Sequence, residues 1–95
     1  MKVIYTKTSI RDLRQIWNYI AKESASAEVA DRYIRRIFDA CDELESSAES
    51  YAPFRYAPKY QMVPFEKYLI LFCVRDNEVK IGRVRHSSRK PFRGR

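Results

Sequence analysis

The sequence predicts an α+β fold with the element order β-α-α-β-β-β, in which a helical hairpin packs on a small antiparallel sheet. In the first half, apolar residues recur in two stretches at spacings of three and four, as on the buried side of a helix. In the second half, short β-prone runs alternate with turn residues. A length of 95 residues with 45% hydrophobic composition suits one domain, residues 1–95, with a single modest core.

The first helix is predicted from a cap and an apolar stripe. Residues 3–5 are β-prone and should form a short strand before it. Ser9 is followed three residues later by Asp12, which fits the capping box of a helix N-terminus. An apolar stripe with spacings of three and four predicts a helix ending near Lys22, and its residues are Ile10, Leu13, Ile16, Trp17 and Ile20.

A second helix should begin at the cap offered by residues 24–26 and run to about Ser47. Because only a short break separates the two helices, they should form a hairpin. Residues 48–59 contain two prolines and three aromatic residues without any periodicity. We therefore expect this segment to be a loop that lies on the core.

Three strands are predicted at residues 60–63, 69–74 and 79–86, separated by tight turns that favour an antiparallel meander. The middle run is apolar throughout, which is typical of a central strand covered on both faces. In the last strand, side chains alternate between the two faces. Arg83 and Arg85 should therefore share one face, and His86 should lie on the other.

The charge of the chain is concentrated at its C-terminal end. Residues 80–95 contain seven of the nineteen Lys and Arg and no acidic residue, whereas the preceding residues contain twelve basic and twelve acidic side chains. This accounts for the formal net charge of +7. A neutral body with a basic strand and a basic tail at residues 87–95 indicates an acidic or polyanionic partner.

Several classes of function lack their sequence signature here. The chain contains no Walker loop, dinucleotide fingerprint, nucleophile elbow, paired-histidine motif or zinc knuckle. We therefore expect neither a cofactor nor a metal site. No apolar run reaches the roughly 18 residues of a membrane span, so we expect a cytoplasmic protein without a membrane partner.

The remaining candidate chemistry is cationic. Arg55, Arg75 and Arg83 can hold a phosphate by charge-assisted contacts, and His86 can move a proton near neutral pH. Such a set is what an RNA-cleaving site requires. The alternative is that Arg83 and Arg85 are the solvated face of a half-buried sheet and that His86 is a structural hydrogen-bonding residue.

Two motifs resemble the RelE/ParE superfamily of bacterial toxins, with a match over about residues 3–90. The first helix carries Asp12-Leu13, Ile16-Trp17 and Tyr19-Ile20-Ala21, and the last strand carries Ile81-x-Arg83-Val84-x-His86-x-x-Arg89. The resemblance implies a toxin of a type II toxin–antitoxin pair, with a helical hairpin on a small antiparallel sheet. It also implies an antitoxin whose acidic or amphipathic C-terminal segment wraps the toxin.

The superfamily has two branches with different targets, and the fold alone does not choose between them. ParE-like members poison DNA gyrase without a known catalytic residue set, whereas RelE-like members cut mRNA at the ribosome. Both motifs are more similar to ParE, so we expect a gyrase inhibitor with no catalytic residue. The alternatives are a ribosome-dependent mRNA endoribonuclease that uses Arg55, Arg75, Arg83 and His86, and an inactive member that keeps only the antitoxin partnership.

Two sets of contact residues follow from this assignment. Target binding is expected from the basic end of the chain, namely from Arg83, Arg85, His86, Arg89, Lys90 and Arg93. Antitoxin binding is expected from aromatic residues near the second helix and the meander, namely from Tyr33, Phe38, Phe54 and Tyr56.

Overall fold

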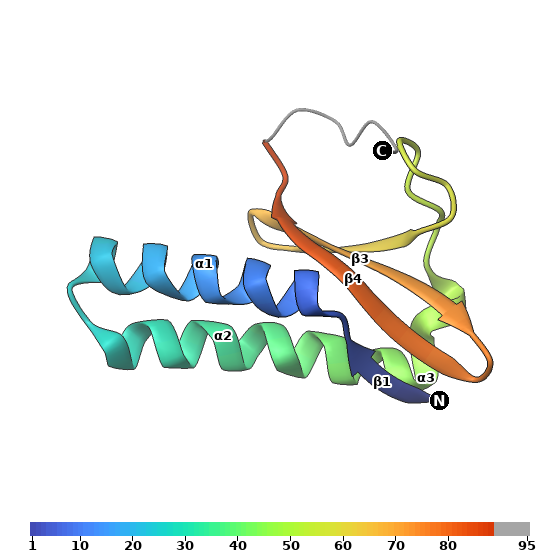
Figure 1. Cartoon of the computed structure of the whole chain (residues 1–95), viewed down its shortest axis with the longest axis horizontal. Coiled ribbons are helices and arrows are strands. Elements are labelled where there is room, and N and C mark those ends of the chain that lie inside the picture. Colours follow the sequence, from blue (N-terminus) through green and yellow to red (C-terminus); the bar gives the residue numbers. More distant parts are fainter. Residues whose placement is uncertain (89–95) are drawn as a thin grey trace.

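The computed structural model describes residues 1–88, which form two layers: a helical hairpin and a four-stranded sheet (Figure 1). The elements are β1 (Lys2–Tyr5), α1 (Lys7–Ser24), α2 (Ala27–Asp42), α3 (Leu44–Ser47), a 3₁₀ turn (Ala48–Ser50), β2 (Gln61–Phe65), β3 (Tyr68–Arg75) and β4 (Glu78–His86). The predicted α+β class and element order are confirmed. Within residues 1–88, no helix is long and apolar enough to cross a membrane.

The sheet has the strand order β1-β4-β3-β2. Strands β2, β3 and β4 form the predicted antiparallel meander. Strand β1 joins the outer edge of β4 in parallel, with Tyr5 opposite Ile81, so the sheet is mixed and not wholly antiparallel. The turn residues of the meander indicate its pairing locally, whereas no turn signal links the first strand to the last.

The start of α1 differs from the sequence prediction. The N-cap is Thr6, whose Oγ1 accepts the Ser9 N–H at 3.1 Å. The predicted capping box of Ser9 and Asp12 is wrong, because Ser9 lies inside the first turn, where its hydroxyl is buried and donates to the Thr6 carbonyl. Asp12 therefore has a different partner.

The second helix begins as predicted, since the Ser26 hydroxyl accepts the Val29 N–H at 3.1 Å. The hairpin turn before it uses Ala25, which has a left-handed φ of 54° and donates its N–H to the Ala21 carbonyl. The helical stretch extends to Ser47, as expected, but it is divided at Glu43 into α2 and α3.

The main core lies between the hairpin and one face of the sheet. Its buried side chains come from α1, α2, α3, the 3₁₀ turn and strands β2 to β4, and they are Leu13, Ile16, Ile37, Cys41, Leu44, Ala48, Val63, Tyr68, Ile70, Phe72, Val79, Ile81 and Val84. A smaller cluster of Phe54, Ala57 and Leu71 joins the 51–60 loop to the sheet. Leu71 alternates with Ile70 and Phe72 along β3, so this cluster covers the opposite face. The loop therefore lies on a core, as predicted.

A β-bulge at Gly82 divides β4 into two halves. Leu71 pairs with Arg83 and Phe72 pairs with Ile81, so Gly82 is the extra residue. Ile81 faces the main core before the bulge, and Val84 faces it afterwards. A Cβ atom at Gly82 would lie 2.7 Å from the Tyr60 ring carbon Cε1. Glycine is therefore needed here for close approach.

We predict that Gly82→Ala lowers the free energy of unfolding by about 1–3 kcal/mol, because the added methyl group displaces the Tyr60 ring. Urea denaturation measures the loss. In a Tyr60→Ala background, the same substitution should cost much less, since the obstructing ring is gone. Equal losses in the two backgrounds would show that the close contact with Tyr60 is not the cause.

Candidate functional site

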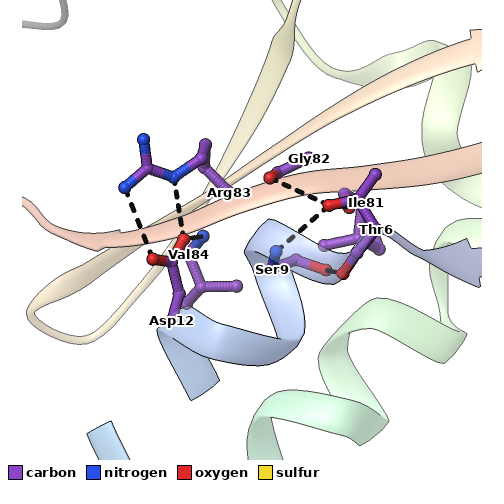
Figure 2. A network of polar contacts seen from close by, with 7 residues as sticks. All are labelled: Thr6, Ser9, Asp12, Ile81, Gly82, Arg83 and Val84. Atoms are coloured by element: carbon purple, nitrogen blue, oxygen red, sulfur yellow. Dashed lines mark hydrogen bonds and ion pairs between the residues drawn. The ribbon is translucent and has the colours of Figure 1, made fainter. Parts of the chain in front are cut away.

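The second half of β4 has no strand on its outer side, because the pairing with β1 ends at Tyr5 and Ile81. The start of α1 completes this edge in place of a strand. The Thr6 N–H donates to the Ile81 carbonyl at 3.1 Å. The Thr6 hydroxyl is shared between the carbonyls of Ile81 at 2.9 Å and Gly82 at 3.2 Å (Figure 2).

Asp12 continues this edge nearly two turns further along α1. Its Oδ2 accepts the Val84 N–H at 2.9 Å and Arg83 Nε at 2.9 Å, while Oδ1 accepts Arg83 Nη2 at 3.3 Å (Figure 2). Asp12 is 8% exposed, so these contacts are largely shielded from water. The hydrogen bond to Asp12 raises the pKa of the Arg83 guanidinium above its usual value. We call this set of contacts the Asp12 clamp.

A cleft of about 350 Å³ lies beside the clamp, between α1 and the end of β4. Its lining comes from both elements, from the start of β3 and from the segment after β4: Asp12, Gln15, Ile16, Tyr19, Tyr68, Arg83, Val84, Arg85, His86 and Ser88. We call it the β4 cleft. One face of α1, the end of β4 and the rings of Tyr19 and Tyr68 therefore meet at this cleft.

Two contacts hold the His86 ring in place at this cleft. Its ring packs edge-on against Tyr68 at 5.4 Å between centroids. Its Nδ1 accepts the Ser88 backbone N–H at 3.1 Å, so in the neutral form the ring hydrogen is on Nε2. The register places His86 opposite Tyr68 and Val84 opposite Ile70, both core residues. The prediction that His86 lies on the other face from Arg83 and Arg85 is confirmed.

The structure does not bring the candidate nuclease residues together. Arg83 and His86 both line the β4 cleft. Arg75 pairs with Glu78 at the other end of β4, about 25 Å from His86 at the usual strand rise. Arg55 lies in the loop that packs on the opposite face of the sheet, where its guanidinium stacks on the ring of Tyr56 at 5.2 Å.

The expected target-binding residues lie at or beyond the end of β4. Arg83, Arg85 and His86 line the β4 cleft, and Arg83 is engaged by Asp12. Arg89, Lys90 and Arg93 lie outside the described residues. The described part of this set is therefore concentrated around one cleft.

The four residues expected to bind antitoxin lie on two separate surfaces. Tyr33 and Phe38 are half-buried on α2, where Tyr33 packs against Phe65 and Phe38 against Tyr5. Phe54 is 5% exposed and belongs to the smaller core, so it offers little surface for a partner. Tyr56 is 44% exposed on the same loop, on the other face of the sheet.

An apolar groove lies between α1 and α2 that was not expected from the sequence. This groove, which we call the hairpin groove, has a volume of about 250 Å³ and is lined by Ile10, Leu13, Arg14, Trp17, Ile34 and Phe38. Arg14 lines the groove, and Lys7 and Arg11 line an adjoining hollow that shares Ile10 and Arg14 with it. The apolar stripe of the first helix includes Ile10, which could have indicated this groove. In the structure Ile10 remains 38% exposed, so the stripe is not fully covered by the core.

We predict that Asp12→Ala lowers the free energy of unfolding by about 2–3 kcal/mol, because it leaves the Val84 N–H and the Arg83 guanidinium without their acceptor. Asp12→Asn should lose less, since its amide oxygen can still accept the Val84 N–H. The matched control is Asp31→Ala, which removes an exposed carboxylate bound to Trp17 and should cost under about 1 kcal/mol. Similar losses at Asp12 and Asp31 in urea denaturation would contradict the clamp.

Comparison with known proteins places this fold in a family. A family model described as "ParE toxin of type II toxin-antitoxin system, parDE" matches residues 3–91. A chain of the solved structure "Chromosomal ParDE TA system from P. aeruginosa" superposes with a TM-score of 0.80 at 20% identity, covering 90% of this chain and 95% of that chain. A search of curated proteins finds no match. With the family model spanning nearly all of its length, the chain belongs to the ParE toxin family of type II toxin–antitoxin systems.

Proposed function

We propose that this ParE-family toxin inhibits DNA gyrase in the cytoplasm, and so replication and growth, until a cognate antitoxin neutralises it. It acts by binding and not by cutting RNA. The observation that carries the choice is that the fold separates Arg55 and Arg75 from the other two candidate nuclease residues, Arg83 and His86. ParE membership supports the same choice, since the resemblance that points to this branch implies a gyrase poison.

An RNA-cleaving site has to place its cations and its acid around one phosphate. Arg75 and His86 lie at opposite ends of the sheet, which prevents them from contacting the same phosphate. Arg83 does lie near His86, but its guanidinium is paired with Asp12. A phosphate that approached Arg83 would have to compete with the Asp12 carboxylate, which already forms a bidentate ion pair with the guanidinium.

The basic end of the chain supports a binding role. The seven Lys and Arg of residues 80–95 have no acidic residue among them. Such a concentration of charge attracts an acidic protein surface or gyrase-bound DNA and raises the rate of association. We propose Arg83, Arg85, His86, Arg89, Lys90 and Arg93 as the target-binding residues.

We predict that the purified toxin, incubated with DNA gyrase, relaxed plasmid and ATP, abolishes supercoiling and traps cleaved DNA. Gel electrophoresis separates the supercoiled, relaxed and linear forms. The matched control is the same reaction with toxin preincubated with its antitoxin, which should restore supercoiling. Full gyrase activity at excess toxin would contradict the proposal and leave the ribosome as the next target to test.

The substitution His86→Ala separates binding from catalysis. In a gyrase inhibitor it removes one contact among several, so we predict that the toxin concentration for half-inhibition rises no more than about threefold. In a nuclease, loss of the acid would slow mRNA cleavage by about 10²–10⁴-fold. The thermal midpoint of unfolding is measured in parallel, so that loss of fold is not mistaken for loss of function.

We also propose that the hairpin groove binds the antitoxin. Its lining is apolar apart from Arg14, and Lys7 and Arg11 line the adjoining hollow, so it is complementary to an amphipathic helix with acidic residues on one side. Of the two expected antitoxin contacts on α2, Phe38 lines the groove, whereas Tyr33 does not and packs against Phe65 of β2.

For the antitoxin contact we predict that Ile10→Asp weakens antitoxin binding by about 10–100-fold, because it places a charge in the apolar floor of the groove. Ile10 is partly exposed, so the toxin should still fold. Tyr56→Ala, on the opposite face, should leave the affinity within about threefold. Calorimetric titration with purified antitoxin measures the affinity of both variants. A larger loss for Tyr56→Ala than for Ile10→Asp would contradict the proposal and indicate that the antitoxin binds at the 51–60 loop.

A further inference from the structure

Three cationic side chains share one face of the first half of α1. Lys7, Arg11 and Arg14 are spaced by four and three residues, which places them on successive turns of the same side of the helix. At the usual helical rise, this row is about 10 Å long. It lies apart from the β4 cleft, since no residue lines both places.

The row lines the hollow that adjoins the hairpin groove, which has a volume of about 330 Å³. We call it the basic hollow, and Tyr5 and Ile10 are its other lining residues. Its lining therefore contains three cations and no acidic side chain. The volume is at the small end of the roughly 300–1,000 Å³ of ligand sites. Because all three cations are exposed, the hollow is accessible to a large partner.

The three cations have no anionic partner in the described part of the chain. Among residues 1–88, none of them forms an ion pair or a hydrogen bond through its side chain. By contrast, Arg36 and Arg83 each bind a carboxylate. An anion can therefore contact the basic hollow without displacing a carboxylate of the toxin itself.

We propose that the basic hollow binds the phosphodiester backbone of double-stranded DNA. The row of about 10 Å spans about three phosphates of one strand, since these follow each other every 3.4 Å along the axis of the duplex. Lys and Arg side chains form charge-assisted hydrogen bonds with phosphate oxygens. Such contacts position a protein on DNA without reading its bases, so the binding should not depend on sequence.

A rigid duplex fits this row better than an acidic peptide does. Exposed charge pairs contribute little one at a time, so a partner has to engage several cations at once. A duplex presents its phosphates at fixed spacing, whereas a flexible peptide loses chain entropy when its carboxylates are aligned. The formal net charge of +7 adds long-range attraction for a polyanion. The proposal does not rest on gyrase as the target, because it concerns α1 and not the basic end of the chain.

The test measures DNA binding by the whole purified toxin, without gyrase or antitoxin. The probe is a fluorescently labelled duplex of about 20 base pairs with random sequence. Fluorescence anisotropy gives the dissociation constant at salt concentrations from about 50 to 200 mM. The test variant combines Lys7→Gln, Arg11→Gln and Arg14→Gln. The matched control combines Lys22→Gln, Arg32→Gln and Arg35→Gln, which removes the same charge from exposed helical positions outside the hollow.

We expect the test variant to bind the duplex at least about tenfold more weakly at about 50 mM salt, and the control to stay within about threefold of the wild type. The dependence of the logarithm of the association constant on the logarithm of salt concentration should become shallower by about 2–3 in the test variant. In the control it should change by less than about 1, because each phosphate contact releases about one counterion.

Folding is checked by the thermal midpoint of each variant. Glutamine is a good helix former and all six positions are exposed, so both variants should fold. The single substitution Arg11→Gln provides a second measurement with a smaller change in the protein. It should make the salt dependence shallower by about 1.

Three results would overturn the proposal. One is that the wild-type toxin does not bind the duplex. Another is a loss in the test variant no greater than that in the control, which would mean that net charge alone attracts DNA. The third is displacement of the duplex by a blocked decaglutamate peptide as readily as by unlabelled duplex at equal charge concentration, which would assign the hollow to an acidic protein. Because gyrase is absent from the experiment, none of these results bears on the gyrase proposal.

Discussion

The position of the last strand against the first helix depends on one carboxylate, that of Asp12. Strand β1 is four residues long and pairs with β4 only as far as Ile81, so the rest of that edge needs other hydrogen-bond partners. Thr6 donates to the Ile81 and Gly82 carbonyls, and Asp12 accepts from the Val84 N–H and from the Arg83 guanidinium. The same contacts hold α1 against the second half of β4 and engage the Arg83 guanidinium.

The parts of the fold that follow from local rules were predictable. Helical periodicity identified the hairpin, and the turn residues identified the meander. The role of Asp12 was not predictable, because its spacing from Ser9 satisfies a local capping pattern while its actual partner is 71 residues away. The need for glycine at the bulge was missed for a similar reason: the ring that leaves no room for a side chain at Gly82 belongs to Tyr60, which comes from a loop distant in sequence.

The candidate site likewise has features that were predictable from the sequence and features that depend on tertiary packing. The basic end was evident from composition, and alternation along the strand placed His86 on the helix side. The separation of Arg75 from His86 could not be judged without the register of β3 and β4. Ile10 was assigned to the apolar stripe of its helix, but only the packing of α2 shows that it borders an open groove. The structure thus offers two separate surfaces, the hairpin groove and the β4 cleft, which allows the proposed antitoxin and target contacts to be tested independently.

The most direct test of the central role of Asp12 is amide hydrogen exchange at Val84, compared between the wild-type toxin and Asp12→Ala. Val79, in the middle of the sheet, serves as the internal reference. The account predicts that Val84 is protected in the wild type and exchanges at least about tenfold faster in the variant, while Val79 remains the more protected of the two. Equal protection of Val84 in both proteins would show that Asp12 is not what completes the edge of the last strand.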